Sequence, residues 1–215
     1  MSDDQGAVHC EVINQVALIT LDRPRALNAL SHAMVLRLHA LLDEVEADEN
    51  LRAVVLRGAG PKAFCAGGDV IALATDIRLA EQHAQLALPE AAVGLLPCGT
   101  GTQMLPALVG EGWAKRMILL GERVDAPTAL RIGLVEEVVD SGQALTQALA
   151  LAGRVSAQSP DSVQACKGLI HAARQGVPRA AALSQERERF MELFNRPNQR
   201  EGVNAFLEKR KAAWQ

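Results

Sequence analysis

Two short apolar runs with one amphipathic segment between them constrain the fold of this chain most. Residues 16–21 and 53–57 have the length and the branched apolar side chains of buried strands. Between them, apolar residues recur at helical spacing, and Ser31 stands where a helix N-cap is expected. A strand, a helix and a second strand in this order predict an α/β domain in which the two strands pair in parallel.

Length, charge and cysteine usage exclude several classes of protein. The chain has 215 residues, a net charge of −3 and four scattered cysteines without a CxxC pair. The balance of charge predicts no nucleic-acid partner, and no apolar run is long enough to span a membrane. The polar, acidic first residues are unlike a secretory signal, and neither the cysteines nor the five histidines have metal-ligand spacing. We therefore expect a cytoplasmic protein with reduced thiols and no bound metal.

A glycine-rich turn follows the second of the predicted strands. Residues 58–61 form a turn, and Gly67 and Gly68 stand side by side a few positions later. Adjacent glycines permit unusual backbone shapes and let a ligand approach the main chain. An N–H group held there can point at a developing oxyanion. Taken alone, however, such a pair is more often a simple turn.

Three motifs in a fixed order resemble the crotonase family, the enoyl-CoA hydratases and isomerases. They are residues 21–30, residues 62–69 and residues 88–97, and the resemblance runs from about Val16 to Lys211. It implies an α/β fold with a crotonase-like ββα spiral core in residues 1–155. It also implies that residues 156–215 form a C-terminal α-helical region that assembles homotrimers or dimers of trimers.

The resemblance also implies roles for single residues. The Gly68 N–H would be one half of an oxyanion hole, and Glu90 would move a proton at the carbon beside the thioester. Arg25 would meet a phosphate of CoA, although it could also be a solvated surface charge. The remaining expected contacts with CoA or substrate are Ala66, Gly67, Asp69, Pro89, Lys209 and Lys211, together with Ala26 and Leu27 beside Arg25. The alternatives are that Asp69 only caps the next helix and that Glu90 only opens a surface turn.

The family pattern is interrupted after Asp69. Glu90 follows Asp69 by only 21 positions, whereas the family's spacing is much longer. The absent stretch would hold a buried strand, the second oxyanion N–H and, in hydratases, the first catalytic glutamate, where this chain has Val70. Either residues are missing from the sequence between Val70 and Ile71, or the protein has lost the segment. We expect the former, because an α/β core rarely tolerates the loss of a central strand. Residues 71–81 are expected to be helical.

These residues predict an enoyl-CoA hydratase that adds water to a 2-enoyl-CoA in fatty-acid metabolism. CoA enters as part of the substrate thioester, and no other cofactor is expected. Two alternatives remain open. One is an enoyl-CoA isomerase in which Glu90 alone shuttles the proton, and the other is an inactive homologue that binds acyl-CoA. A true deletion at Val70 would favour the inactive homologue.

Overall fold

The computed structural model describes residues 5–67, 69–99 and 101–215. The chain divides into two compact units, Met1–Leu151 and Ala152–Gln215, each of which is described by itself. The sequence placed the change near residue 155. Among the described residues, no helix has the length and apolar character that a membrane span requires.

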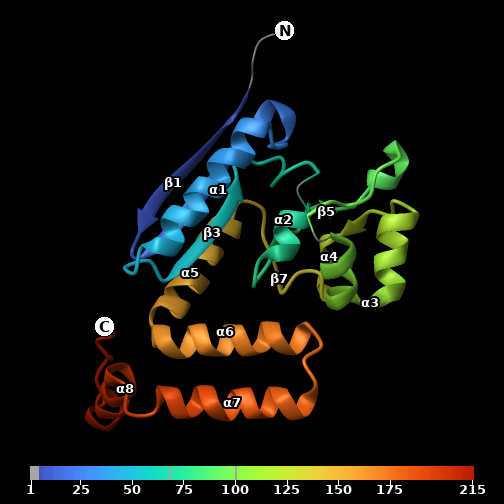
Figure 1. The fold of residues 1–215 in the computed structure, drawn as a ribbon. Helices are drawn as coiled ribbons and strands as arrows, with labels where there is room; N and C mark the ends of the chain where they lie inside the picture. Colours follow the sequence, from blue (N-terminus) through green and yellow to red (C-terminus); the bar gives the residue numbers. More distant parts are fainter. Residues whose placement is uncertain (1–4, 68, 100) are drawn as a thin grey trace. The chain divides into compact units, whose positions relative to one another are not determined.

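A three-stranded sheet opens the first unit (Figure 1). Strand β1 (Ala7–Ile13) pairs antiparallel with β2 (Val16–Asp22), and β2 pairs in parallel with β3 (Ala53–Gly58). The parallel pairing predicted for residues 16–21 and 53–57 is therefore confirmed. The register places Leu21 beside Gly58, so the chain leaves β2 and β3 at the same end of the sheet.

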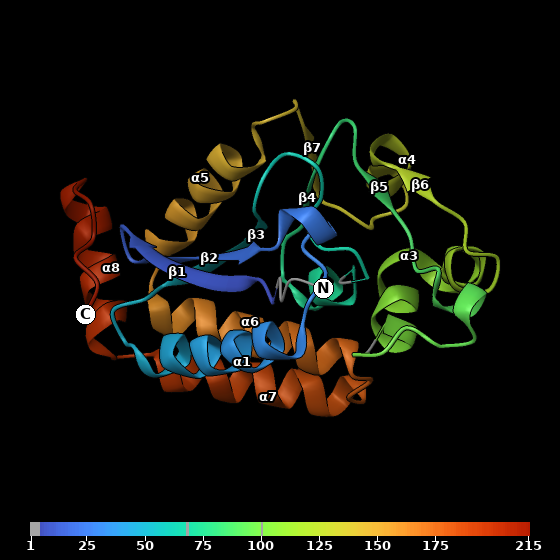
Figure 2. The same ribbon diagram turned by 90° about the horizontal axis from the view of Figure 1, so that it is seen from above.

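Helix α1 (His32–Ala47) lies along one face of this sheet (Figure 2). Its N-cap is Ser31, as predicted, and the Ser31 hydroxyl accepts a hydrogen bond of 3.3 Å from the Met34 N–H. Met34 and Leu38 from the helix pack with Ile19 from β2 in the first core cluster. Burial of these side chains stabilises the packing of α1, which connects β2 to β3, against the sheet.

A second core cluster lies in the part of this unit that follows β3. Its elements are α2 (Asp69–Ala74), β4 (Leu79–Glu81), β5 (Gln85–Leu86), the 3₁₀ helix η2 (Glu90–Val93), α3 (Gly101–Leu119), β6 (Val124–Asp125), α4 (Ala126–Arg131) and β7 (Glu137–Val139). Strands β4 and β7 pair in parallel, and β5 and β6 pair antiparallel. Helix α3 is kinked at Gly110, whose φ of 77° is not helical.

The expected helix over residues 71–81 is wrong in its second half. Helix α2 ends at Ala74, and residues 79–81 form β4 instead. The buried Arg78 explains the change, because its backbone N–H donates to the Glu136 carboxylate and its Nε donates to the Leu134 carbonyl at 2.8 Å. The Arg78 guanidinium also forms an ion pair with Glu136. Tertiary pairing beside β7 thus overrides the local helical pattern.

The join between Val70 and Ile71 connects the two core clusters. Val70 and Ile71 are neighbours in α2, and the expectation that residues are missing between them stays a prediction. Ile71 packs against the first cluster, whereas Val70 packs against the second. A Cβ atom on Gly101 would lie 2.7 Å from a Val70 methyl group, so α2 and the start of α3 touch closely. The join is therefore a packed contact between the two halves of the unit.

The second unit is helical. Helix α5 (Ala144–Ser156) leads into it, and α6 (Pro160–Arg174), α7 (Arg179–Leu193) and α8 (Pro197–Glu208) follow. Proline stands in the first turn of α6 and of α8, where its missing N–H leaves no intrahelical hydrogen bond unmade. Helices α6 and α7 pack side by side (Figure 1).

Candidate functional site

Two loops meet at the carboxyl ends of β2 and β3. The first contains the short 3₁₀ helix η1 (Pro24–Ala26), and the second runs from Gly58 to Gly67. The Ala66 N–H donates to the Leu27 carbonyl at 2.8 Å, and the Ala59 N–H donates to the Leu21 carbonyl at the same distance. The fold thereby brings together five residues that the sequence assigned to CoA, namely Arg25, Ala26, Leu27, Ala66 and Gly67.

The two loops have unusual backbone conformations where they meet. Leu27 and Asn28 have φ of 50° and 59°, and Gly67 has φ of 70°. A left-handed backbone is strained for Leu27, and such strain persists only where surrounding contacts enforce it. No atom of the described residues would lie within 4 Å of a Cβ added to Gly67, so its main chain is open to them on that side. Glycine suits this place because of its φ, and the open side leaves room for a ligand.

Arg25 is exposed on the first loop, and no hydrogen bond or ion pair is found for it within the described part of the chain. A guanidinium group without a carboxylate partner remains available to an incoming phosphate. Contact of Arg25 with a CoA phosphate stays a prediction.

Two of the predicted residues lie outside what the structure describes. Gly68, the expected oxyanion donor, is not among the described residues. Asp69 is the first residue of α2, but its side chain is not described either. Their roles as oxyanion donor and as substrate contact or helix cap stay predictions.

Glu90 opens η2 directly after Pro89. The residue is half-buried, and its Oε2 is fully buried without a hydrogen-bond partner in the described structure. Buried carboxylate oxygens normally have partners, because leaving one without a partner costs about 1–3 kcal/mol. Such an atom suits a group that receives or delivers a proton when a ligand binds.

The surroundings of Glu90 are only partly apolar. Leu88 is buried, but Pro89 is exposed, and Val93 exposes 74% of its surface. Helix α3 follows η2 after a short loop and packs on α2, which follows Gly67. The Glu90 segment and the glycine loop are thus connected through the contact between α2 and α3.

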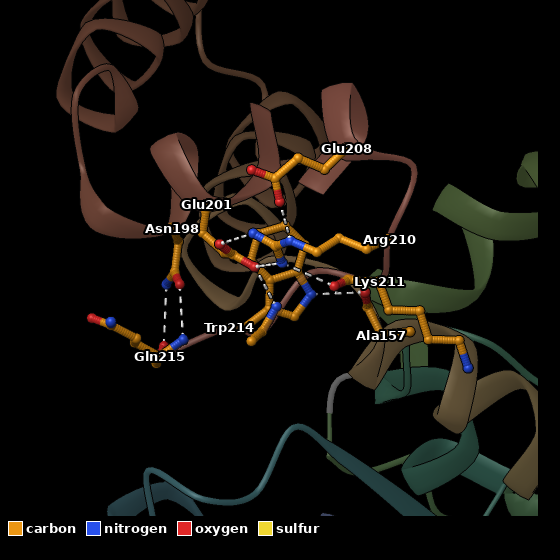
Figure 3. Close-up of polar contacts among 9 residues, drawn as sticks. Ala157, Asn198, Glu201, Glu208, Arg210, Lys211, Trp214 and Gln215 are labelled. Carbon is orange, nitrogen blue, oxygen red and sulfur yellow. Dashed lines mark hydrogen bonds and ion pairs between the residues drawn. The ribbon is translucent and has the colours of Figure 1, made fainter. Parts of the chain in front are cut away.

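The two predicted lysines belong to the second unit. Lys209 ends α8 with φ of 54°, and Lys211 follows in the C-terminal tail. The tail folds back on α8, where Glu201 accepts hydrogen bonds from the Arg210 guanidinium at 2.6 and 2.9 Å (Figure 3). The Lys211 ammonium group extends away from this hydrogen-bonded cluster (Figure 3). Contact of either lysine with CoA stays a prediction.

Two open hollows of about 390 and 310 Å³ lie elsewhere on the first unit. Trp113 and Arg123 line the larger one, Gln143 lines the smaller one, and no predicted site residue lines either. Among the described residues, no group of three or more His, Cys, Asp or Glu side chains could hold a metal ion.

Sequence reasoning missed the structural role of Asn28. Asn28 belongs to the motif of residues 21–30, for which no role of this residue was predicted. Its side chain is buried and forms three hydrogen bonds with backbone groups of the two loops. A polar residue between Leu27 and Ala29 was the only local signal.

Comparison with known proteins gives one family consistently. Two family models described as Enoyl-CoA hydratase/isomerase match residues 66–215 and 16–82. The chain is 34% identical to the putative enoyl-CoA hydratase/isomerase YngF of Bacillus subtilis, covering 93% of this chain and 94% of YngF. It is 32% identical to the short-chain-enoyl-CoA hydratase of Clostridium acetobutylicum, covering 92% and 93%. The alignment with YngF extends over 245 positions, more than the 215 residues of the printed sequence, so some aligned positions have no counterpart in that sequence.

Solved structures give the same result. DspI of Pseudomonas aeruginosa is 43% identical and superposes with a TM-score of 0.90 over 97% of this chain and 96% of DspI. The enoyl-CoA hydratase of Bacillus anthracis is 29% identical, with a TM-score of 0.91 over 98% of each chain. The α/β crotonase fold with its C-terminal helical region is therefore confirmed. With its motifs, its fold and its relatives in agreement, the chain belongs to the crotonase family of enoyl-CoA hydratases and isomerases.

Proposed function

We propose that this protein binds 2-enoyl-CoA thioesters and hydrates them, with Glu90 as the proton carrier. The observation that supports this most is the Glu90 Oε2, which is buried without a hydrogen-bond partner in the described structure. Relatives named as hydratases, including the short-chain-enoyl-CoA hydratase of Clostridium acetobutylicum, support the substrate class. A role in fatty-acid metabolism and a cytoplasmic location stay predictions.

The two loops would hold the coenzyme part of the substrate. Arg25 would pair with a phosphate of CoA, and the backbone at Ala66 and Gly67 would lie along the coenzyme. The Gly68 N–H would donate to the thioester oxygen as negative charge develops on it. In hydration, the hydroxyl of water bonds to the β-carbon while a proton is added to the α-carbon. Glu90 would transfer that proton.

One observation supports a second candidate. Val70 stands where the family resemblance expects the first glutamate, and it packs against Gly101. A valine cannot activate water, so Glu90 would have to act without a second carboxylate from this position. The alternatives are therefore isomerisation of the double bond by Glu90 alone, or binding of acyl-CoA without turnover.

We further propose that residues are missing from the printed sequence between Val70 and Ile71, because an α/β core rarely tolerates the loss of a central strand. The alternative is a true deletion, which the close packing of Val70 on Gly101 and of Ile71 on the first core favours. The intact mass distinguishes the two, because the printed sequence corresponds to 22.9 kDa. A mass several kDa higher supports missing residues, whereas a mass of 22.9 kDa contradicts them and favours the inactive homologue.

A homotrimer, or a dimer of trimers, is proposed for the assembly. The second unit exposes many large apolar side chains for its size, which is typical of a surface that another chain covers. They are Ile170, Leu183, Phe190, Met191, Phe194, Val203, Phe206 and Leu207. Light scattering at micromolar concentration tests the proposal, and a monomer mass would contradict it.

An assay of the purified protein with crotonyl-CoA and longer 2-enoyl-CoA esters tests the proposed function. Formation of a 3-hydroxyacyl-CoA supports hydration, and a shifted double bond without added water identifies an isomerase. If CoA binds in calorimetry but no ester is converted, the protein is a binding homologue and the hydratase proposal fails.

A further inference from the structure

The Asn28 side chain uses its amide fully on backbone groups. Only 1% of the residue is exposed. Its Oδ1 accepts a hydrogen bond of 2.9 Å from the Arg23 N–H. Its Nδ2 donates to the Ala59 carbonyl at 2.9 Å and to the Ala63 carbonyl at 2.7 Å. Both amide hydrogens and the amide oxygen therefore have partners.

These partners lie in two different loops. Arg23 begins the loop that carries Arg25, whereas Ala59 and Ala63 lie 31 and 35 residues beyond Asn28, in the loop that leads to Gly67. The Asn28 side chain therefore joins the two loops by hydrogen bonds.

The contact between the two loops around Asn28 is tightly packed. A Cβ atom on Gly58 would lie 2.6 Å from the Asn28 Nδ2 and 2.3 Å from the Phe64 carbonyl oxygen. Backbone from both loops thus closes tightly around the amide. Asn28 itself has φ of 59°, a conformation that asparagine tolerates better than most residues.

We infer that Asn28 is the positioning residue of the coenzyme site. It holds the Arg25 loop and the Ala66–Gly67 segment in one fixed arrangement before the ligand arrives. This inference rests on the proposed function, because it takes these two loops to be the surface that binds CoA. The Ala66 N–H donates to the Leu27 carbonyl at 2.8 Å in the same contact between the loops, and this hydrogen bond depends on that arrangement.

Preorganisation explains why one buried amide matters for binding. If the loops were free to separate, CoA would have to order them on binding, and part of its binding free energy would be lost. Asn28 does not contact the ligand in this account. Its loss should weaken affinity even though the Arg25 guanidinium and the Gly67 backbone are still present.

Two substitutions test this role. Asn28→Asp keeps the size of the side chain but turns a carboxylate oxygen toward the Ala59 and Ala63 carbonyls. Asn28→Gly removes the side chain and accepts the left-handed backbone, so it provides a second variant if the first does not fold. The control is Met117→Ala, which removes a buried side chain from the second core cluster and lowers stability without touching either loop.

The measurement is calorimetric titration with CoA, beside urea unfolding of each protein. We expect both Asn28 variants to bind CoA at least about tenfold more weakly than the parent, the equivalent of about 1.4 kcal/mol. The folded Met117→Ala protein should bind CoA within about twofold of the parent, although its urea midpoint falls. Amide exchange at Ala66 should be faster in the Asn28 variants than in the control.

The inference is overturned if the folded Asn28 variants bind CoA as tightly as the parent. It is also overturned if Met117→Ala weakens binding as much as they do, because the effect would then follow stability alone. If the parent itself does not bind CoA, the proposed function fails and this inference fails with it. Binding by the parent with unchanged affinity in the variants refutes only the role of Asn28.

Discussion

Replacement of Glu90 by glutamine is expected to abolish turnover while leaving the fold intact. Glutamine keeps the length and a hydrogen-bonding end, but it cannot carry a proton. A general acid–base group contributes a factor on the order of 10² to 10⁴ in rate. That factor corresponds to about 3 to 5 kcal/mol at the barrier. Affinity for CoA should change little, because the proposed coenzyme contacts lie on the loops after β2 and β3.

The structure also predicts the sign of the effect on stability. Oε2 of Glu90 is buried without a partner in the described structure, and burying such an oxygen costs about 1–3 kcal/mol. The amide of Glu90→Gln carries no charge, so the folded state should lose no stability and should gain up to about 1 kcal/mol. A loss of activity together with equal or greater stability is typical of a functional residue held at the expense of the fold.

The assay compares parent and variant on the ester that the parent converts fastest, beside urea unfolding and CoA titration. Glu111→Gln is the matched control, because Glu111 is an exposed glutamate of α3 whose ion pair joins it only to Lys115. The control should keep the parent rate. The reasoning is refuted if Glu90→Gln retains a large share of that rate, because Glu90 would then not be the proton carrier.

Three further outcomes are expected. Arg25→Ala should weaken CoA binding at low salt, and the difference from the parent should shrink as salt rises, which titrations at two ionic strengths will check. Arg78→Ala should lower the free energy of unfolding by about 3 kcal/mol, because it leaves the partly exposed Glu136 carboxylate and the Leu134 carbonyl without their buried partner. A urea midpoint equal to that of the parent would contradict this. The Arg210 guanidinium holds the pKa of Glu201 down at about 2, from an ordinary value of 4.5. Because a lowered carboxyl pKa stabilises the folded state above the ordinary value, this contribution should be lost as pH falls from about 4.5 to about 2. The protection factors of the backbone amides in the C-terminal tail should fall over that range in the parent and not in Glu201→Gln.

Local patterns predicted the first half of the chain well. The parallel pairing of β2 and β3 follows from two apolar runs of strand length with a helix between them, and burial of Ile19 and Leu21 makes that pattern strong. Ser31 was predicted as an N-cap because its hydroxyl can satisfy an N–H of the first helical turn without help from distant residues. Asp125 caps α4 in the same way, because its carboxylate accepts from the Thr128 N–H at 2.9 Å.

Interactions across long sequence separations were beyond such patterns. Arg78 stops a local helical pattern by pairing with Glu136, 58 residues away, and nothing in residues 71–81 announces that partner. Leu134 and Val135 are apolar residues just before β7, but the strand begins only at Glu137, because the backbone N–H groups of Leu134 and Val135 both donate to the Ala129 carbonyl of α4. Local propensity is weak wherever one tertiary contact supplies more free energy than several residues of preference.

The candidate site also shows the difference between what local motifs predict and what depends on contacts between distant residues. Arg25, Ala66 and Gly67 were predicted because the family resemblance carries residue identities, and the fold brings the loops that contain them together after two adjacent parallel strands. The sequence motif gave no role to Asn28, because the Ala59 and Ala63 carbonyls that its side chain binds lie more than thirty residues later. Motifs identify groups that meet a ligand, whereas the residues that hold those groups in place become visible only when the hydrogen bonds of the folded chain are traced. Such positioning residues decide whether loops from distant parts of the chain form one binding surface.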